Sequence, residues 1–163
     1  MKKTASTVFL LLFLATALPA QAQRPATTAD STAAIASALR AGKKDLLTGG
    51  ARAVVGDRSP GSNHIWPRAV LAGPASQIGA QVVRYSDVVR CVDRTPTGCV
   101  LVGNIQLLVV DEADFQGDTA LVEVRVLAPS TGTNSIASRS LEYVVVRRAG
   151  IWTVTGIKSA TYL

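Results

Sequence analysis

The stretch AQVVRYSDVVRCVDRTPTGCVLVGNIQLLVVD, residues 80–111, decides the fold expected for this chain. It contains two runs rich in valine, isoleucine and leucine, Ala80–Asp93 and Cys99–Asp111, on either side of the turn-forming residues 94–98. Two such runs separated by a loop of hairpin length favour a pair of antiparallel strands. We therefore predict a hairpin that begins a longer antiparallel sheet.

A single register of this hairpin accounts for both its cysteines and its polarity. If Cys91 lies opposite Cys99, then Val83 lies opposite Leu107, and alternate side chains project from one largely apolar face. Tyr85 and Asp87 belong to that face, opposite Ile105 and Gly103. The mixed second face carries Arg84, Arg90, Asn104 and Gln106.

Three more strands are predicted downstream, at residues 119–127, 138–148 and 151–159, because apolar and polar residues alternate there. The acidic segment Asp111–Asp118 is predicted to be a loop, and so is the segment Ala128–Ala137. The inward-facing residues expected from the alternation are Val122, Val124, Leu141, Tyr143, Val145, Trp152 and Val154.

The last hairpin is expected to turn at Ala149-Gly150, a pair that can supply the positive φ angles of a tight turn. A two-residue turn would place Val145 opposite Val154 and Tyr143 opposite Gly156.

The N-terminal half predicts a helix that is capped by Asp30 or Ser31 and ends near Leu47, before Gly49-Gly50. Its apolar stripe comprises Ala34, Ile35, Ala38, Leu39 and Leu46. A short strand is expected at residues 51–55, and a short helix within residues 65–78 that Gly73-Pro74 interrupts. The sequence thus predicts an α+β fold with an N-terminal helix packed on a curved antiparallel meander sheet of four to six strands.

The first residues predict a cleaved Sec signal peptide at residues 1–22. Lys2 and Lys3 precede the apolar run Val8–Leu18, and small residues lead up to Ala22. The apolar run is shorter than a membrane span, so we expect no stable membrane anchor after cleavage. Residues 23–29 are predicted to be a disordered arm, and residues 30–163 a single domain. The expected location is the bacterial periplasm or the extracellular medium.

Cys91 and Cys99 are the only cysteines, and an even pair in an exported chain predicts a disulfide. Their spacing does not match a zinc site, and no glycine-rich phosphate loop leads into a helix, so neither a metal nor a cofactor is predicted. The formal net charge is +6, part of it from Lys2 and Lys3. Because the other basic residues are scattered, we predict no nucleic-acid binding.

The last hairpin, LEYVVVRRAGIWTV at residues 141–154, is an alternating apolar strand followed by basic residues, a glycine turn and a tryptophan. With the preceding helix and meander, it resembles the nuclear transport factor two-like, or cystatin-like, α+β superfamily, mainly over Gly117–Ile157. The helices before the sheet are shorter than is usual in that group. Its members include isomerases, dehydratases and non-catalytic binding or scaffold domains, so the resemblance implies a fold and leaves the activity open.

Three groups of residues are candidate sites. Asp87, with Tyr85 or Tyr143 as hydrogen-bond donor, is a candidate general base or acid in a pocket under the helix, because burial raises the pKa of a carboxyl. His64 is the only histidine, and we expect it in a surface loop, since no Gly-x-Ser-x-Gly elbow accompanies it. The third group, on the mixed face, is a candidate anion or partner site comprising Arg84, Arg90 and Arg125 with Asn104 and Gln106.

The function predicted from these observations is that of an exported, non-catalytic domain that binds a small ligand or a protein through its curved sheet. Two alternatives stay open: an isomerase- or dehydratase-type enzyme that uses Asp87, and a purely structural envelope protein. Val100–Val102 and Leu107–Val110 are apolar on both faces. A cover for the second face is therefore expected, and a homodimer packed sheet to sheet would supply it.

Overall fold

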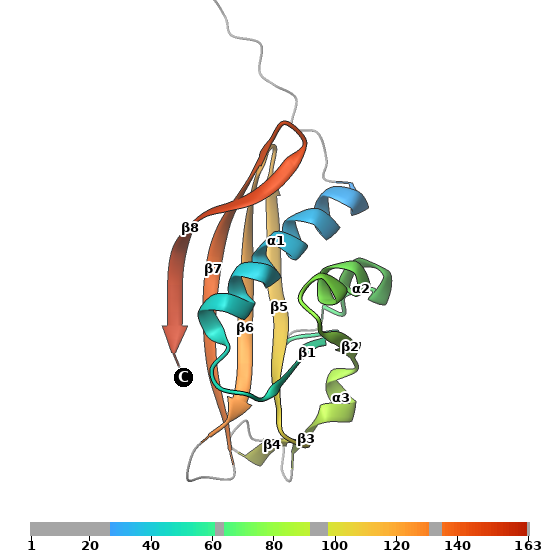
Figure 1. The fold of residues 1–163 in the computed structure, drawn as a ribbon, viewed down its shortest axis with the longest axis vertical. Coiled ribbons are helices and arrows are strands. Elements are labelled where there is room, and N and C mark those ends of the chain that lie inside the picture. The colour runs from blue at the N-terminus through green and yellow to red at the C-terminus, as the bar shows by residue number, and fades with distance from the viewer. Residues whose placement is uncertain (1–26, 61–63, 92–97, 131–134, 163) are drawn as a thin grey trace, which may run out of the picture.

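A computed structural model describes residues 27–60, 64–91, 98–130 and 135–162. These residues form an α+β fold with an N-terminal helix, a six-stranded mixed sheet and a two-stranded sheet (Figure 1). The predicted signal peptide at residues 1–22 lies outside the described residues, as do residues 23–26 of the predicted arm. The elements are α1 (Thr28–Leu46), β1 (Arg52–Gly56), α2 (Arg68–Gln77), β2 (Gln81–Val83), α3 (Tyr85–Val88), β3 (Val89–Cys91), β4 (Cys99–Leu101), β5 (Ile105–Gln116), β6 (Thr119–Pro129), β7 (Ile136–Arg148) and β8 (Ile151–Tyr162).

Helix α1 begins earlier than predicted, because its cap is Thr27 and not Asp30 or Ser31. The Thr27 hydroxyl accepts a hydrogen bond from the backbone N–H of Asp30 at 3.1 Å, and the Asp30 carboxylate accepts one from the backbone N–H of Thr27. This reciprocal arrangement is a capping box, in which an acidic residue occupies the third helical position. Residues 27–29, assigned to the disordered arm, therefore belong to the cap and first turn of α1.

The C-terminal strands β5, β6, β7 and β8 form the predicted antiparallel meander. The remaining strands differ from the prediction, because β1 pairs with β5 in parallel and β2 pairs with β1 in parallel. The sheet order is therefore β2-β1-β5-β6-β7-β8. β1 takes the position beside β5 that the hairpin prediction reserved for residues 80–93.

The segment Ala80–Asp93 is not one strand. β2 adds to the edge of β1, where Asp57 donates its backbone N–H to Val83 and its carboxylate accepts the N–H of Tyr85 at 2.9 Å. The Asp57 contacts accompany the chain's turn from β2 into α3, and β3 then pairs with β4 in a separate small sheet. Since Tyr85 and Asp87 are helical, the predicted pairs Tyr85–Ile105 and Asp87–Gly103 do not form. Residues 92 and 93 lie outside the described residues.

The segment Cys99–Asp111 is also divided. β4 ends at Leu101, and Gly103 adopts a φ of 85°, which allows a sharp turn before β5 begins. Leu107 consequently pairs with Val54 of β1 and with Leu127 of β6, and the predicted pair with Val83 is wrong.

β5 runs through the acidic segment that was predicted to be a loop. After a bulge between Val110 and Glu112, Ala113 and Phe115 point inward and alternate with exposed polar residues up to Gln116. Alternation of this kind stabilises a half-buried strand even when its outward residues are charged. The turn is confined to Gly117 and Asp118, with Gly117 at a φ of 63°.

The last hairpin turns at Ala149 and Gly150 as predicted, with φ angles of 50° and 80°. Val145 pairs with Val154, as expected. A bulge between Val144 and Val145 then shifts the register by one residue, so that Tyr143 pairs with Ile157 and not with Gly156.

Helix α2 continues past Pro74 to Gln77, whereas the sequence predicted an interruption at Gly73-Pro74. Pro74 lies in the last turn of this short helix, so few intrahelical hydrogen bonds are lost. Its ring is buried, and burial of the ring favours keeping the turn.

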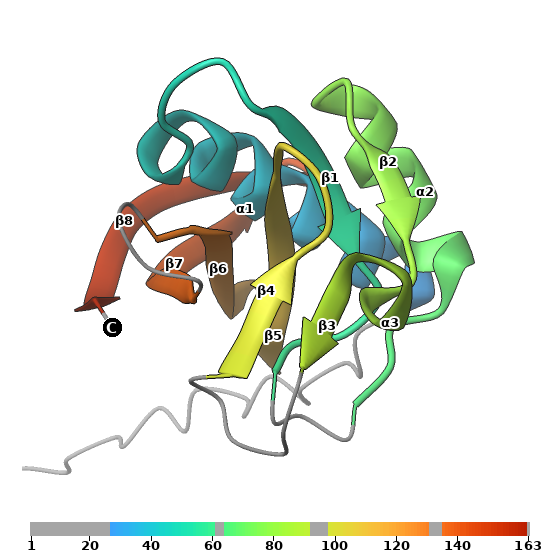
Figure 2. The same ribbon diagram turned by 90° about the horizontal axis from the view of Figure 1, so that it is seen from below.

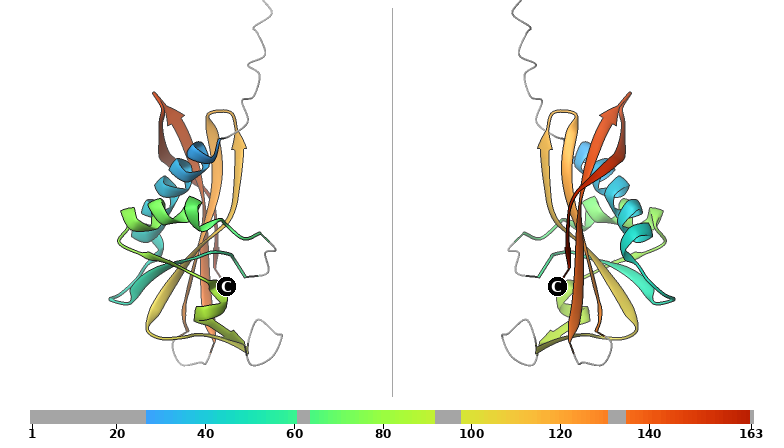
Figure 3. Two further views of the ribbon diagram at one scale, coloured as in Figure 1. Left: turned by 90° about the vertical axis from the view of Figure 1, so that its right-hand side faces the viewer. Right: turned by 90° about the vertical axis from the view of Figure 1, so that its left-hand side faces the viewer.

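The sheet has one core on each face. Figures 2 and 3 show α1 and α2 on one side and β3, β4 and α3 on the other, near the lower end of the sheet. The helix-side core includes the predicted stripe of α1 and the inward residues of β6, β7 and β8, among them Ile35, Leu39, Val122, Val124, Tyr143 and Trp152. The core on the opposite face, called the outer face below, comprises Val54, Val89, Ile105, Leu107, Val109 and Leu127.

The outer-face core confirms part of the predicted grouping of the hairpin's odd-numbered residues. Val83, Tyr85, Cys99 and Leu101 pack against it, so most odd-numbered residues of the predicted hairpin do share one cluster. They line the face opposite α1, however, not a cavity beneath the helix. The homodimer was predicted because a second apolar face needed a cover. The chain's own small sheet covers this part of the outer face.

Candidate functional site

The residues predicted to form a catalytic pocket do not meet. Asp87 is exposed on α3, and Tyr85 packs in the outer-face core. Tyr143 is fully buried on the opposite side of the sheet, in the helix-side core. The prediction that these three side chains share one face is wrong, because α3 replaces the strand on which it depended.

Each tyrosine of this group has its own structural role. The Tyr143 hydroxyl donates to the Asp45 carboxylate at 3.1 Å. Burial first, and the Asp45 carboxylate second, raise the pKa of Tyr143 above its usual value. Burial also raises the pKa of Tyr85, although the Arg58 guanidinium over its ring opposes the shift. The carboxylate that the Tyr143 hydroxyl binds is therefore that of Asp45 in α1, and not that of Asp87.

Cys91 and Cys99 form the predicted disulfide across the β3–β4 pair. A disulfide indicates a non-cytoplasmic, oxidising compartment. Among the described residues, no group of three or more His, Cys, Asp or Glu side chains could hold a metal ion. In the same residues, no helix is long and apolar enough to cross a membrane.

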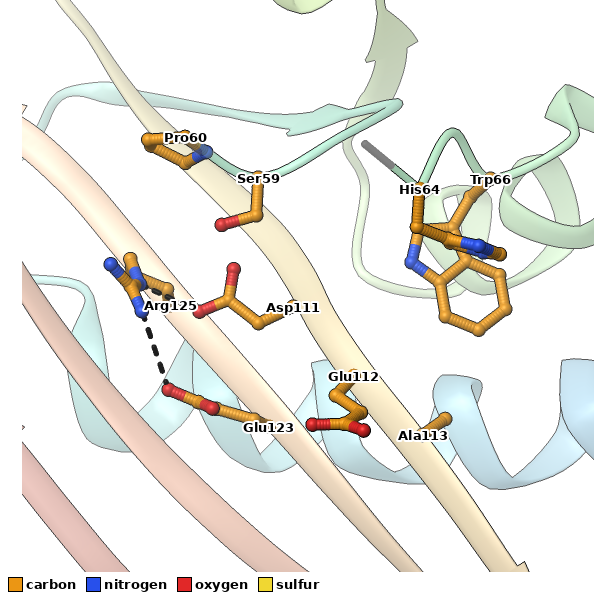
Figure 4. Close-up of a pocket in the computed structure, with 9 residues that line it drawn as sticks. All are labelled: Ser59, Pro60, His64, Trp66, Asp111, Glu112, Ala113, Glu123 and Arg125. Atoms are coloured by element: carbon orange, nitrogen blue, oxygen red, sulfur yellow. Dashed lines mark hydrogen bonds and ion pairs between the residues drawn. The ribbon is translucent and has the colours of Figure 1, made fainter. Parts of the chain in front are cut away.

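A cleft of about 500 Å³ lies on the outer face, beside the upper half of β5. Figure 4 shows Asp111 near its middle, with α1 behind the strands. Ser59 lies on one side of Asp111, Arg125 and Glu123 on another, and His64 and Trp66 across from them. The full set of lining residues is Ser59, Pro60, His64, Trp66, Asp111, Glu112, Ala113, Glu123 and Arg125.

Unequal strand lengths create this cleft. β1 pairs with β5 only as far as Leu108, and no other strand of the described ranges pairs with the rest of β5 on that side. Trp66 lies at this open edge, and its indole N–H donates to the Val110 carbonyl at 2.9 Å. The backbone N–H of Trp66 also donates to the Asp57 carbonyl at 2.8 Å. These two bonds hold the indole as a fixed wall of the cleft.

The bulge in β5 directs two acidic residues toward the outer face in succession. Val110 pairs with Val124 and Glu112 pairs with Glu123, which leaves Asp111 as the additional residue. A bulge turns a side chain that regular alternation would place elsewhere. Asp111 and Glu112 therefore both line the cleft, together with Glu123 from the adjacent strand.

Asp111 is held by one ion pair and is otherwise desolvated. Its Oδ2 accepts from Arg125 Nε at 2.6 Å, and Arg125 Nη2 lies 3.5 Å from Glu123 Oε1. The Asp111 side chain is only 11% exposed. Burial raises the pKa of this carboxyl to about 6, because desolvation outweighs the attraction of the Arg125 guanidinium.

Two oxygen atoms in the cleft are buried without a hydrogen-bond partner in the described part of the chain. They are Asp111 Oδ1 and Ser59 Oγ, and Ser59 as a whole is 4% exposed. Buried polar atoms are nearly always hydrogen-bonded, so an unsatisfied pair is a feature that requires an explanation. Both oxygens belong to residues that line the same cleft (Figure 4).

The other predicted polar residues are dispersed. His64 is exposed in a surface loop, as predicted, and its ring meets that of Trp66 edge to face at 4.5 Å between centroids. Arg84 and Arg90 are exposed away from the cleft, as is Asn104. Of the predicted basic group only Arg125 enters the cleft.

Gln106 was also predicted to lie on the mixed face, and that prediction is wrong. It is buried, and its amide both accepts from the Thr48 backbone N–H and donates to the Thr48 carbonyl. Gln106 therefore joins the end of α1 to β5.

Sequence reasoning missed Asp111 because the acidic run 111–118 was interpreted as a loop. One signal was available: Ala113 and Phe115 alternate with polar residues, which is the pattern of a half-buried strand. The bulge that leaves Asp111 and Glu112 both on the outer face, and the proximity of Asp111 to Ser59, have no sequence signature of comparable strength.

Comparisons of the chain with protein-family models, with curated proteins and with solved structures return no significant match. The resemblance to the nuclear transport factor two-like superfamily therefore stays a prediction.

Proposed function

We propose that this protein is an exported, non-catalytic domain of the periplasm or extracellular medium that binds a small ligand in the Asp111 cleft. The observation that carries the proposal is the pair of buried, unsatisfied oxygens of Asp111 and Ser59. A ligand with hydrogen-bond donors would satisfy both atoms. The volume of the cleft is within the range of small-molecule sites.

The charge balance of the cleft favours binding over catalysis. Asp111 is engaged by Arg125, and Arg125 by Glu123, so the three side chains hold one another in place. A general base requires a free carboxylate against a reacting group and a nucleophile or acid in register with it. Asp111 is instead paired with Arg125 at 2.6 Å, so its carboxylate is not free for that role. The enzyme alternative that uses Asp87 has no pocket to support it, because Asp87 is exposed on α3.

The experiment is a thermal-shift screen of the purified mature chain against a panel of small metabolites. Binding to the native state raises the midpoint of unfolding by mass action. Each ligand that shifts the wild type is then tested on Asp111→Asn and, as a matched control, on Asp87→Asn. We expect the shift to persist in Asp87→Asn and to disappear in Asp111→Asn.

Two outcomes contradict the proposal. Equal shifts in Asp111→Asn and the wild type would mean that the ligand binds elsewhere. If no compound in a broad panel shifts the wild type, the purely structural envelope alternative is favoured.

A further inference from the structure

We infer that the ligand of the Asp111 cleft carries a primary ammonium group, bound between Asp111 Oδ1 and Ser59 Oγ. The inference rests on the proposed function and adds the chemical class of the ligand. It follows from the charge of the cleft, the hydrogen-bonding character of its two buried oxygens and the form of its walls.

The charged groups of the cleft favour a cation. Three carboxyl groups, of Asp111, Glu112 and Glu123, line it against the single guanidinium of Arg125. That guanidinium already contacts two of the carboxylates, at 2.6 and 3.5 Å. An anionic ligand would meet uncompensated repulsion from Glu112, whereas a cation would complete the charge balance.

The two buried oxygens select a cation that can donate hydrogen bonds. Asp111 Oδ1, as a carboxylate oxygen, only accepts, and the Ser59 hydroxyl can accept as well. A primary ammonium has three N–H donors, enough for both buried oxygens and for the neighbouring Glu112 carboxylate. A quaternary ammonium has none, so both oxygens would stay unsatisfied at a cost.

The remaining wall suits the organic part of such a ligand. The Trp66 indole N–H donates to the Val110 carbonyl, the Trp66 backbone N–H donates to the Asp57 carbonyl, and the His64 ring packs against the indole. Pro60 adds a further apolar surface.

The test is a titration of the ¹⁵N-labelled mature chain, followed by ¹H–¹⁵N correlation spectra near neutral pH. The probes are n-butylammonium, tetramethylammonium, 1-butanol and butyrate, which differ in charge and in the ability to donate hydrogen bonds. We expect n-butylammonium to shift the resonances of Ser59, Trp66 and Asp111 in a saturable way. Tetramethylammonium, butanol and butyrate should shift them at least about tenfold more weakly, the factor expected for a lost charged hydrogen bond.

Two variants locate the ammonium group. Asp111→Asn should weaken n-butylammonium binding about tenfold or more, and Ser59→Ala by a factor of about 2 to 10. Asp87→Asn removes a carboxylate that lies outside the cleft, so this variant should bind n-butylammonium like the wild type. The spectra themselves show whether each variant is folded.

The outcomes separate this inference from the proposed function. If butanol or butyrate binds the cleft as well as n-butylammonium, the cleft is a ligand site but the ammonium assignment is wrong. If Ser59→Ala and Asp111→Asn both bind n-butylammonium like the wild type, the ammonium does not lie between these oxygens. If no probe shifts the cleft resonances while the screen finds ligands that depend on Asp111, only the inference fails; if the screen finds none either, both fail.

Discussion

At the scale of single residues, Asp111 is the group whose placement carries the functional proposal. Its carboxyl is nearly buried, and one of its two oxygens has no partner in the described residues. Ionisation of a desolvated carboxyl is unfavourable, which is why its pKa is raised to about 6. The folded protein therefore carries a destabilising charge at neutral pH, as binding sites commonly do when binding and stability compete.

Asp111→Asn is expected to stabilise the protein near neutral pH in the absence of ligand. Asparagine has the shape of the acid without its charge, so the cost of the buried carboxylate is removed. The difference between a pKa of about 6 and the usual 3.8 corresponds to a gain on the order of 3 kcal/mol. Urea unfolding monitored by circular dichroism measures it.

The matched control for that experiment is Asp87→Asn, an exposed aspartate outside the cleft, which should change the unfolding free energy by less than about 0.5 kcal/mol. A loss of stability in Asp111→Asn would mean that the ion pair with Arg125 outweighs desolvation. The electrostatic account of the cleft would then be wrong.

At the scale of elements, the packing of α1 on the sheet depends on a glycine. A Cβ atom built on Gly42 would lie 2.8 Å from Cγ1 of Val124, closer than real Cβ contacts come. Gly42 is buried in α1 over β6, so its missing side chain sets how closely the helix approaches the sheet. The helix stripe alone did not predict this requirement.

Gly42→Ala is expected to destabilise the protein by about 1 to 3 kcal/mol through overpacking, even though alanine favours helix by up to about 1 kcal/mol. Gly73→Ala in α2 is the control, because nothing lies within 4 Å of a Cβ there and φ is not positive. That variant should be neutral or slightly more stable. Chemical unfolding of both variants decides the matter, and equal effects would contradict the close approach of α1 to β6.

The β3–β4 pair is a second element with a specific cross-link. The Cys91–Cys99 disulfide closes a short loop in the small sheet that covers the outer-face core. Replacing both cysteines by serine is expected to cost about 2 kcal/mol, at the low end for disulfides because the loop is short. Unfolding of the variant is compared with unfolding of the reduced wild type, which should lose a similar amount. A variant as stable as the oxidised wild type would show that the small sheet needs no cross-link.

At the scale of the whole molecule, two carboxyl groups with opposite pKa shifts shape the dependence of stability on pH. Asp30 joins the start of α1 to the last hairpin, because it accepts from Thr27, from the Trp152 indole at 3.1 Å and from Arg147 at 2.8 Å. The hydrogen bonds from Thr27 and then Trp152 lower the pKa of Asp30 to about 2, and the Arg147 charge adds to the effect. Asp111 is shifted the other way.

The expected profile follows from these signs. The contribution of Asp30 is present above its unfolded pKa of 3.8 and is lost as the pH falls toward 2. The contribution of Asp111 is present below 3.8 and is lost as the pH rises through about 6. To the extent that these two groups control stability, the unfolding temperature should be highest near about pH 4 and should decrease at both lower and higher pH. Asp111→Asn should flatten the upper limb and Asp30→Asn the lower one.

His64 is the control for the upper limb, since it also lines the cleft. His64→Gln should leave the fall between about pH 4 and 6 in place if Asp111 causes it. If Asp111→Asn leaves the same fall, the carboxyl that controls it lies elsewhere in the molecule. Light scattering of the same samples tests the predicted homodimer.

The sequence by itself determined the parts of this protein that depend on local patterns. Period-two alternation predicted the strands of the C-terminal meander, the spacing of Ile35 and Leu39 predicted the buried face of α1, and the positive-φ turn was predicted at Ala149-Gly150. These features follow from contacts between residues close in sequence or from one repeating pattern. The disulfide was predictable too, because two cysteines allow one pairing.

Only the tertiary structure decided which strand lies beside β5, and with it the site. An apolar run can pair with several partners. In this fold β1 pairs with the edge of β5 in parallel, and residues 85–88 form α3. That choice left the upper half of β5 open, where the bulge at Asp111 meets Ser59, 52 positions earlier in the chain. Local sequence patterns do not encode such a meeting, because it depends on how competing long-range pairings are resolved across the whole fold.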